Sequence, residues 1–400
     1  MDVCIYFQVH QPLRLAQYSI FESTTVSPDG GWAHKGKKYF DADLNAQIMD
    51  KIAKKCYLPT NALMLELLEK HPEFKISYSL TGVFIEQCKE FSPEVLESFK
   101  QLARTGRVEF LSETYYHSLS YLFSNKEEFI SQVDLHAKAI SEFATPSKVF
   151  RNTEAMFSND IAYHVERLGY TGILAEGLEH ILGWRSPNYL YTVKGCDRIK
   201  ALLRNFKLSD DIGYRFSAKW WSEYPLTADK YANWLSQLQG DCVNIFMDYE
   251  TFGEHHWSDT GIFEFLRHFP GEAAKHQNIR FATPSELVEK IPPRDDIDAP
   301  QVTSWADMER DTSAWLGNEM QTSAFSMLEA MENSVKDKQD PELMRTWRML
   351  GNSDHFYYMC TKSLSDQDVH NYFSPYDSPF DAYINYMNVL TDFKDRIEKS

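Results

Sequence analysis

The chain has 400 residues, of which 43% are hydrophobic and 25% charged, an ordinary globular composition with ample length for one large domain and a smaller one. A formal net charge of −17 argues against nucleic-acid binding, because phosphate contacts need a basic face. Aromatic residues make up 14%, including nine Trp and 22 Tyr. This content suits a carbohydrate ligand, whose flat C–H faces pack on aromatic rings, as well as it suits a large aromatic core.

The six cysteines show no CxxC spacing, and several lie inside apolar runs. This usage predicts reduced, buried thiols and a cytoplasmic location. We expect no signal peptide, since the first apolar run begins at Val3. Because no apolar stretch approaches about 18 residues, we also expect no membrane span.

Short apolar runs alternate with helical segments over the first 290 residues or so. The predicted strands are residues 3–9, 75–81, 108–112, 148–154, 172–175, 199–203, 243–248 and 279–282. Strands that alternate with helices indicate a parallel sheet, here with enough units for a barrel.

Residues typical of helix starts and ends support the alternation of strands and helices. Ser92-Pro93 predicts a helix start, and Gly106 follows that helix. Ser124 with Glu127, and Thr283 with Glu286, have the spacing of a capping box.

The chain changes character after a candidate linker at residues 291–300. Beyond it the pattern predicts helices over residues 313–336, 341–361 and 380–397. We therefore expect an α/β barrel domain over residues 1–291 and a helical domain over residues 300–400 that completes a substrate cleft.

Two of the predicted strands end on an acid. Residues 148–154 end at Glu154 and residues 243–248 end at Asp248, while His10 closes the first strand. Reactive groups of a parallel barrel gather at the carboxyl ends of its strands. Two acids that meet across such a cleft are what glycoside hydrolysis requires.

Glu254-His255-His256 raises the alternative of a metal-dependent deacetylase. Adjacent histidines point in different directions on a regular element, so a shared metal ion is not the default interpretation. We expect neither a metal nor another cofactor.

Five segments together resemble the ordered motifs of family 57 glycoside hydrolases. They are His10-Gln11-Pro12, residues 106–111, Phe150-Arg151-Asn152-Thr153-Glu154, residues 247–253 and residues 305–321. The resemblance implies an incomplete (β/α)7 barrel of the TIM type followed by a C-terminal helical bundle, and a retaining mechanism on α-glucans. It places the nucleophile on Glu154 and the acid/base on Asp248. The third and fourth motifs look closest to the α-amylase branch of the family.

The candidate substrate-binding residues come from these motifs and from the aromatic content. They are His10, Gln11, Glu109, Asn152, Trp221, Glu250, Trp257, Asp311 and Trp315, with Trp220 as a further stacking candidate. On an alternating strand Asn152 shares the face of Glu154, whereas Arg151 either belongs to the site or forms a salt bridge outside the barrel. We expect the pKa of Asp248 to be raised by burial and by a neighbouring negative charge, for which Glu250 is a candidate.

The predicted activity is hydrolysis of α-1,4-glucosidic bonds. A 4-α-glucanotransferase or branching enzyme of the same family is the first alternative, because these enzymes share the glycosyl-enzyme and differ in what attacks it. A non-catalytic glucan-binding protein is a further alternative. The sequence leaves the oligomeric state open.

Overall fold

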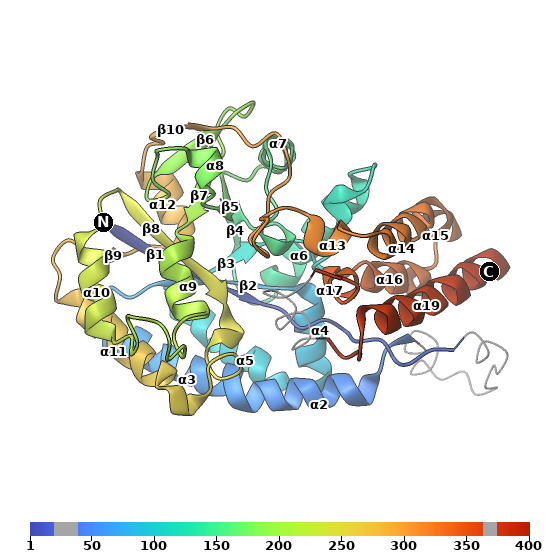
Figure 1. The fold of residues 1–400 in the computed structure, drawn as a ribbon, viewed down its shortest axis with the longest axis horizontal. Coiled ribbons are helices and arrows are strands. Elements are labelled where there is room, and N and C mark those ends of the chain that lie inside the picture. The colour runs from blue at the N-terminus through green and yellow to red at the C-terminus, as the bar shows by residue number, and fades with distance from the viewer. Residues whose placement is uncertain (20–38, 363–373) are drawn as a thin grey trace.

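Parallel strands in the centre of the molecule form a closed barrel (Figure 1). The structure is a computed structural model that describes residues 1–19, 39–362 and 374–400. Within these residues, the barrel consists of β1 (Asp2–Val9), β2 (Ile76–Leu80), β3 (Val108–Ser112), β4 (Pro146–Phe150), β5 (Gly172–Glu176), β7 (Lys200–Arg204) and β8 (Cys242–Asp248). β8 pairs with both β1 and β7, which closes the sheet on itself. The predicted barrel class is confirmed.

Three short strands extend the sheet outside the barrel. β6 (Leu190–Val193) runs antiparallel to β7, and β10 (Asp295–Ile297) pairs with β6. The predicted strand at residues 279–282 is reduced to β9 (Arg280–Phe281), which pairs only with the start of β1. The sequence did not predict β6, and it predicted a linker where β10 lies. The boundary between the two expected domains stays a prediction.

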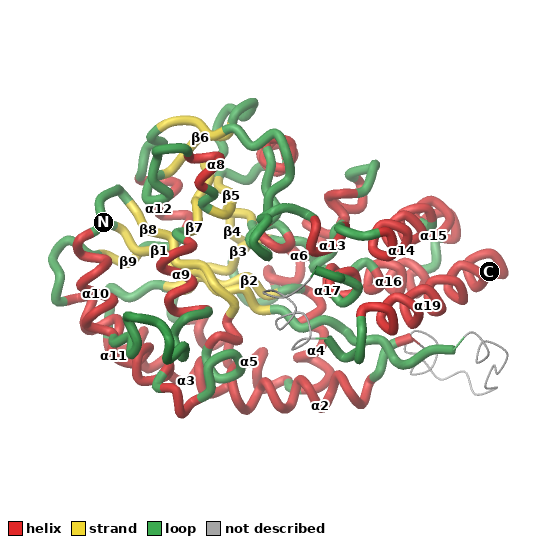
Figure 2. The backbone as a smooth tube through the Cα atoms, in the orientation of Figure 1, coloured by secondary structure: helices red, strands yellow, loops and turns green. Residues whose placement is uncertain are grey.

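Helices surround the barrel (Figure 2). They are α2 (Ala42–Ile52), α3 (Leu58–Lys70), α4 (Gly82–Phe91), α5 (Pro93–Arg104), α6 (Glu127–Ser141), α7 (Asn159–Arg167), α8 (Glu179–Leu182), α9 (Phe206–Gly213), α10 (Ala228–Gln237), α11 (Ile262–Ala274) and α12 (Pro284–Lys290). Thr283 and Glu286 form the predicted capping box at α12. The capping box predicted at Ser124 is wrong, because α6 begins after Lys126, and the Ser124 backbone N–H donates instead to Glu329.

Strand alternation fills the barrel interior. The inward-facing apolar side chains come from alternate strand positions, and α12 closes the amino end beneath them. This cluster comprises Cys4, Tyr6, Leu111, Val149, Leu174, Leu190, Leu202, Cys242, Phe246, Ala282, Leu287, Val288 and Ile291. Because alternation continues along each strand, the next inward positions at the carboxyl ends fall on polar residues, including Gln8, Arg204 and Asp248.

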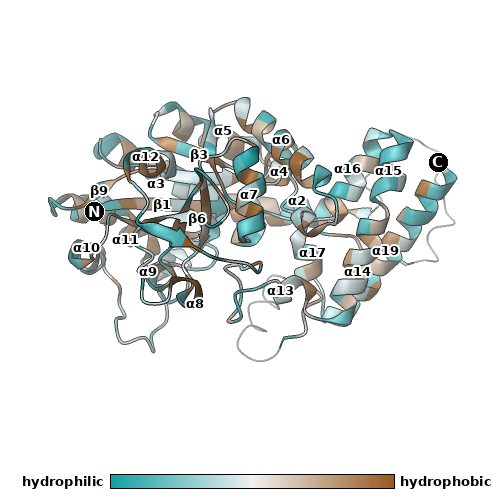
Figure 3. Ribbon diagram, turned by 90° about the horizontal axis from the view of Figure 1, so that it is seen from above, coloured by the Kyte–Doolittle hydropathy of each residue, from teal (hydrophilic) through white to brown (hydrophobic). Residues whose placement is uncertain are grey.

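The C-terminal helices gather at one end of the molecule, away from the N-terminus (Figure 3). They are α13 (Ser313–Leu316), α14 (Glu319–Ala330), α15 (Glu332–Lys338), α16 (Pro341–Leu350), α17 (Ser353–Tyr357) and α19 (Pro379–Lys399). The helices predicted over residues 313–336 and 341–361 are each interrupted, the second between α16 and α17, whereas the helix predicted over residues 380–397 is confirmed as the continuous α19. Trp315 and Trp347 belong to the same buried cluster as Phe150 of β4, so the helical part packs directly on the barrel.

All six cysteines are free thiols; Cys196 is half-buried and the others are buried. Within the described residues no helix is both long and apolar enough to cross a lipid bilayer. The cytoplasmic location stays a prediction.

Candidate active site

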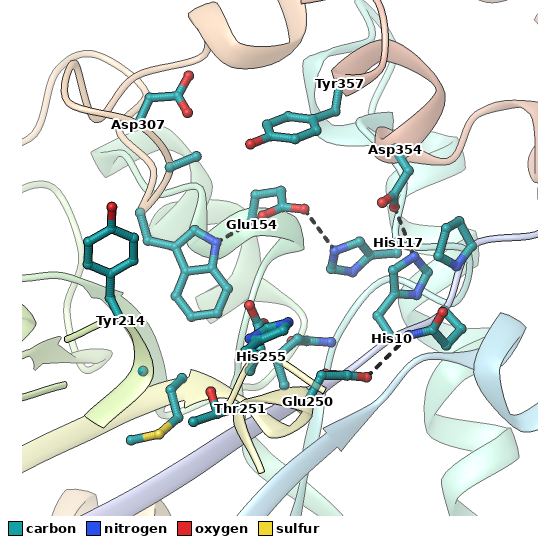
Figure 4. Close-up of a pocket in the computed structure, with 18 of the residues that line it drawn as sticks. His10, His117, Glu154, Tyr214, Glu250, Thr251, His255, Asp307, Asp354 and Tyr357 are labelled. Atoms are coloured by element: carbon teal, nitrogen blue, oxygen red, sulfur yellow. Dashed lines mark hydrogen bonds and ion pairs between the residues drawn. The ribbon is translucent and has the colours of Figure 1, made fainter. Parts of the chain in front are cut away.

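A pocket with a cavity of about 380 Å³ opens at the carboxyl ends of the barrel strands (Figure 4). Its wall comes from four parts of the chain: the barrel strand ends with the turns after them, the end of α9 with Tyr214, the segment 305–310, and α17 with the residue after it. The lining residues used below are Gln8, His10, Gln11, His117, Arg151, Glu154, Arg204, Tyr214, Asp248, Glu250, His255, Trp305, Asp354 and Tyr357. Figure 4 shows Tyr214 and His10 on opposite sides of this pocket.

Glu154 is held by two hydrogen bonds from different parts of the chain. His117 Nε2 donates to Oε1 at 3.1 Å, and Trp305 Nε1 donates to Oε2 at 2.9 Å. Burial raises the pKa of Glu154, but the hydrogen bond and charge of His117 and the charge of Arg151 outweigh it and hold this pKa below its usual value. Glu154 is therefore ionised at neutral pH.

The sequence predicted that Glu154 is the last residue of its strand, and this prediction is wrong. β4 stops at Phe150, and Glu154 lies in a short 3-10 turn with a φ of 56°. A left-handed conformation is uncommon for a residue with a side chain, and such strain is concentrated at functional sites. His117, which contacts Glu154, is also left-handed, with a φ of 51°. Both members of this hydrogen bond thus sit on unusual backbone.

The early strand end decides between the two alternatives for Arg151 and contradicts the prediction for Asn152. Arg151 is fully buried, lines the pocket and lies over the Trp305 ring, with its Cζ atom 4.7 Å from the ring centroid. The alternative of a salt bridge outside the barrel is therefore wrong. Asn152 is buried but does not line the pocket, because the turn and not strand alternation brings Glu154 inward.

Asp248 is the last residue of β8, as predicted, and it lines the pocket. Burial and then the negative charge of Glu154 raise the pKa of Asp248 to about 6, against the opposing charges of Arg151, His117 and Arg204. Asp248 consequently retains its proton in mildly acidic solution, whereas Glu154 does not. Glu154 and Asp248 thus form a pair of one ionised and one protonated carboxyl group.

Glu250 is not the negative neighbour expected for Asp248. Burial and then the charge of Asp248 raise the pKa of Glu250 to about 8, so this group is protonated at neutral pH. Its Oε1 atom accepts hydrogen bonds from the Tyr57 hydroxyl and, at 3.5 Å, from Gln11 Nε2. A neutral carboxyl group that lines the pocket can donate a hydrogen bond to a ligand hydroxyl.

His10 joins the barrel to the helical part. Its Nδ1 atom lies 2.9 Å from Thr81 Oγ1, and its Nε2 atom lies 3.1 Å from Asp354 Oδ2 of α17. Burial and the charge of His117, which stacks on His10 at 4.1 Å, lower the pKa of His10. Burial alone would raise the pKa of Asp354, but the bond to His10 prevails and lowers it to about 2.

Glu109 lies at the opposite end of the barrel from the pocket. It is the second residue of β3 and is bonded to Ser147 and to Ser285, beside the start of α12. Asp311 accepts from the Ser313 backbone N–H at 2.8 Å, and it does not line the pocket.

The predicted tryptophan platforms do not line the pocket either. Trp315 is buried beside Tyr357, and Trp221 packs on Trp234. Trp220 and Trp257 are exposed, with Lys55 over the ring of Trp257. Of the predicted residues, the structure brings together His10, Gln11, Glu154, Asp248 and Glu250.

Several pocket residues were missed as site residues. His117 follows the strand predicted over residues 108–112, and Trp305 opens the fifth motif, so both had a sequence signal. Asp354 and Tyr357 lie on a C-terminal helix with no chemical motif around them. Tyr214, which is 62% exposed, follows α9 and had no signal beyond the general aromatic content.

The side chains of Glu254, His255 and His256 lie in different surroundings. Glu254 pairs with Lys51 at 2.5 Å, and His256 Nδ1 lies 2.8 Å from Ser217 Oγ. His255 lines the pocket. Among the described residues no group of three metal-ligating side chains is found.

Comparison with known proteins agrees with this fold and pocket. The profile of Glycosyl hydrolase family 57 matches residues 4–300, close to three quarters of the chain. The chain belongs to this family, which confirms the resemblance drawn from the five motifs. This family is a family of glycoside hydrolases. Individual proteins also resemble the chain.

A protein of Methanocaldococcus jannaschii named "Putative alpha-amylase" is 48% identical over 405 residues, covering 98% of this chain and 84% of that protein. An alpha-amylase of Pyrococcus abyssi is 23% identical over 257 residues, covering 62% of this chain but only 37% of that protein. Among solved structures, a GH57-type branching enzyme of Pyrococcus horikoshii has a TM-score of 0.67 at 14% identity, covering 96% of this chain and 88% of that one. At such low identity the last likeness shows the fold alone.

Proposed function

We propose that the protein is a retaining glycoside hydrolase that cleaves α-1,4-glucosidic bonds of starch, glycogen or maltooligosaccharides. The observation that carries the proposal is the opposite protonation of two pocket carboxyl groups, Glu154 and Asp248. Two acids whose environments separate their pKa values define the two roles of such a reaction. The α-glucan substrate is supported by family membership and by the relative named as an alpha-amylase.

In the first half of the reaction, ionised Glu154 attacks the anomeric carbon and forms a covalent glycosyl-enzyme. Asp248 donates its proton to the oxygen of the leaving sugar. The bonds from His117 and Trp305 fix the two oxygens of Glu154 before the attack, so little reorganisation is needed in the transition state.

In the second half, Asp248 removes a proton from water, and the resulting hydroxide displaces Glu154 from the anomeric carbon. Aromatic rings at the pocket, including Trp305, Tyr214 and Tyr357, offer apolar faces to the sugar rings. Protonated Glu250 and the pair of His10 and Asp354 supply hydrogen-bonding groups for sugar hydroxyls.

Transfer to a second sugar is the competing outcome for the same glycosyl-enzyme, and relatives of both kinds exist, including the branching enzyme of Pyrococcus horikoshii. Products from maltoheptaose separate the possibilities. Hydrolysis yields only shorter oligosaccharides. Longer products would indicate a 4-α-glucanotransferase, and products sensitive to a debranching enzyme would indicate branching.

Replacing the nucleophile tests whether any of these activities arises in this pocket. Glu154→Gln keeps the size of the side chain and removes its charge, so hydrolysis of maltooligosaccharides should fall by at least about 10⁴-fold while the fold is kept. Asp259→Asn, a matched change of an exposed acid, should leave activity unaltered. Near-full activity of Glu154→Gln would show that Glu154 is not the nucleophile.

A further inference from the structure

Glu113 is a fully buried carboxyl group immediately behind the pocket and is not among the residues that line it. Its Oε1 atom accepts hydrogen bonds from Gln8 Nε2, at 3.1 Å, and from the Ser79 hydroxyl. Its Oε2 atom lies 3.2 Å from His117 Nδ1. Burial of a carboxylate is costly unless it is hydrogen-bonded, and here both oxygens have partners. The mechanism proposed above gives this group no role.

His117 lies between two carboxyl groups, with Glu113 on Nδ1 and Glu154 on Nε2 at 3.1 Å. A neutral imidazole has one donor and one acceptor nitrogen, so it can satisfy only one carboxylate. If both carboxylates are ionised, both ring nitrogens must donate, and His117 must be an imidazolium.

His136 provides the contrast within the same cluster. The backbone N–H of Glu113 donates to His136 Nδ1 at 3.2 Å, and His136 Nε2 donates to the carbonyl of Leu80 at 2.8 Å. One nitrogen accepts and the other donates, which defines a neutral ring. Two buried histidines that contact Glu113 are thus held in different protonation states by their partners.

The negative charge on the pocket side of His117 is temporary. When Glu154 bonds to the anomeric carbon it becomes an ester and loses its charge, whereas Glu113 keeps its own. The other ionisable groups around His117 are His10, Arg151, Asp248 and Asp354. Of these groups, His10 stacks on the His117 ring and Arg151 is a cation, so neither favours the protonated form of His117.

We propose that Glu113 is a positioning residue that keeps His117 an imidazolium throughout both halves of the reaction. The inference rests on the proposed role of Glu154 as nucleophile. In the glycosyl-enzyme, the His117 Nε2–H group remains aimed at the ester oxygen that must become a carboxylate again. It stabilises the negative charge that returns to Glu154 when water attacks, and no proton moves between these groups.

The ionisation of the pair agrees with this arrangement. Burial lowers the pKa of His117, but the bonds and charges of Glu113 and Glu154 prevail and raise it to about 9. Burial raises the pKa of Glu113, but its bond to His117 and the charges of His117 and Arg151 lower it to about 2.

Nitrogen NMR of ¹⁵N-labelled histidine tests the proposal without requiring activity. In Glu154→Gln, whose neutral side chain imitates the esterified state, both ring nitrogens of His117 should still carry protons at pH 7.5. In the double variant Glu113→Gln/Glu154→Gln, His117 should be neutral at that pH. The His136 ring should stay neutral in both proteins and serves as the folding control.

A neutral His117 in Glu154→Gln alone would overturn the proposal, and so would a charged His117 in the double variant. If the double variant does not fold, the single variant decides. A failure of the proposed nucleophile would show in the products and in the Glu154→Gln activity, not in these spectra.

Kinetics of Glu113→Gln provide a second readout that a merely structural role would not produce. With an activated aryl glycoside as donor, slow breakdown of the glycosyl-enzyme should give a burst of released phenol. The steady-state kcat should fall at least tenfold, with KM falling in parallel. A loss of kcat at unchanged or higher KM and without a burst would contradict the proposal.

Discussion

Glu154 and Asp248 have similar side chains, yet the pocket holds one as a carboxylate and the other as an acid. The difference comes from their neighbours. Cationic His117 and Arg151 prevail over burial at Glu154, whereas burial and the charge of Glu154 prevail at Asp248. Burial and the same cations act on both groups, but Glu154 also accepts a hydrogen bond from His117, which helps to lower its pKa.

The activity should consequently be confined to acidic solution. Activity needs ionised Glu154, so it is lost as the pH falls through the lowered pKa of that group. It also needs protonated Asp248, so it is lost as the pH rises through about 6. We expect a bell-shaped profile of kcat/KM against pH whose alkaline limb lies near pH 6. A rate that continues to rise above pH 8 would contradict the assignment of the acid.

Both carboxyl groups could be predicted from the sequence: Asp248 because an apolar strand ends on it, and Glu154 because it closes the third family motif. The roles of Arg151 and Asn152 could not, since they depend on where β4 stops. A shift of the strand end by a few residues exchanges the side chains that face inward. The turn that presents Glu154 leaves no signal in residue spacing.

At the scale of elements, positive-φ residues identify positions that favour glycine. Gln339, the exposed residue that ends α15, is left-handed with a φ of 53°. The left-handed conformation costs a residue with a side chain about 1–2 kcal/mol, and glycine avoids this cost.

Gln339→Gly should therefore raise the free energy of unfolding by about 1 kcal/mol, measured by urea denaturation. Lys338→Gly, one residue earlier and inside the helix, should instead lower it by about 0.5–1 kcal/mol. An equal loss of stability in both variants would show that the backbone conformation at Gln339 is not strained.

All the barrel strands were predicted, since each is an apolar run between helices. β6 and β10 were missed because they are short, and because β10 consists of Asp295, Asp296 and Ile297, whose composition favours a loop. Pairing with a neighbouring strand stabilises β10 there, and a single sequence does not reveal that pairing.

At the scale of the whole molecule, a buried ion pair joins the helical part to the barrel. Arg348 of α16 donates to both oxygens of Glu128 on α6, at 2.8 and 3.0 Å, and Glu128 is completely buried. α16 leads directly into α17, which carries the pocket residue Asp354. The ion pair therefore supports one wall of the pocket.

Arg348→Met should lower the free energy of unfolding by about 3 kcal/mol, because it leaves a buried carboxylate without its partner. Arg345→Met on the same helix removes a partly exposed ion pair with Glu86 and should cost less than about 1 kcal/mol. The double variant Arg348→Met/Glu128→Leu should recover most of the loss. Equal effects of the two single changes would contradict a special role for the buried pair.

The contribution of the helical part to the pocket could be expected from the family resemblance, but its residues could not. Asp354 contacts His10, and Trp305 contacts Glu154, only through the packing of segments that are far apart in the chain. Asp354 has no chemical motif around it, and the motif that begins at Trp305 does not indicate which residue Trp305 contacts.

Azide rescue of Glu154→Ala tests the central claim, that Glu154 is the nucleophile of a retaining enzyme, most directly. With an activated α-glucosyl donor and excess azide, the small anion should enter the space left by the carboxylate and attack the face opposite the leaving group. We predict a β-glycosyl azide, detected by the anomeric proton coupling in NMR. An α-glycosyl azide would identify Glu154 as the acid/base, and the absence of any azide product together with retained hydrolysis would contradict a covalent role for this residue.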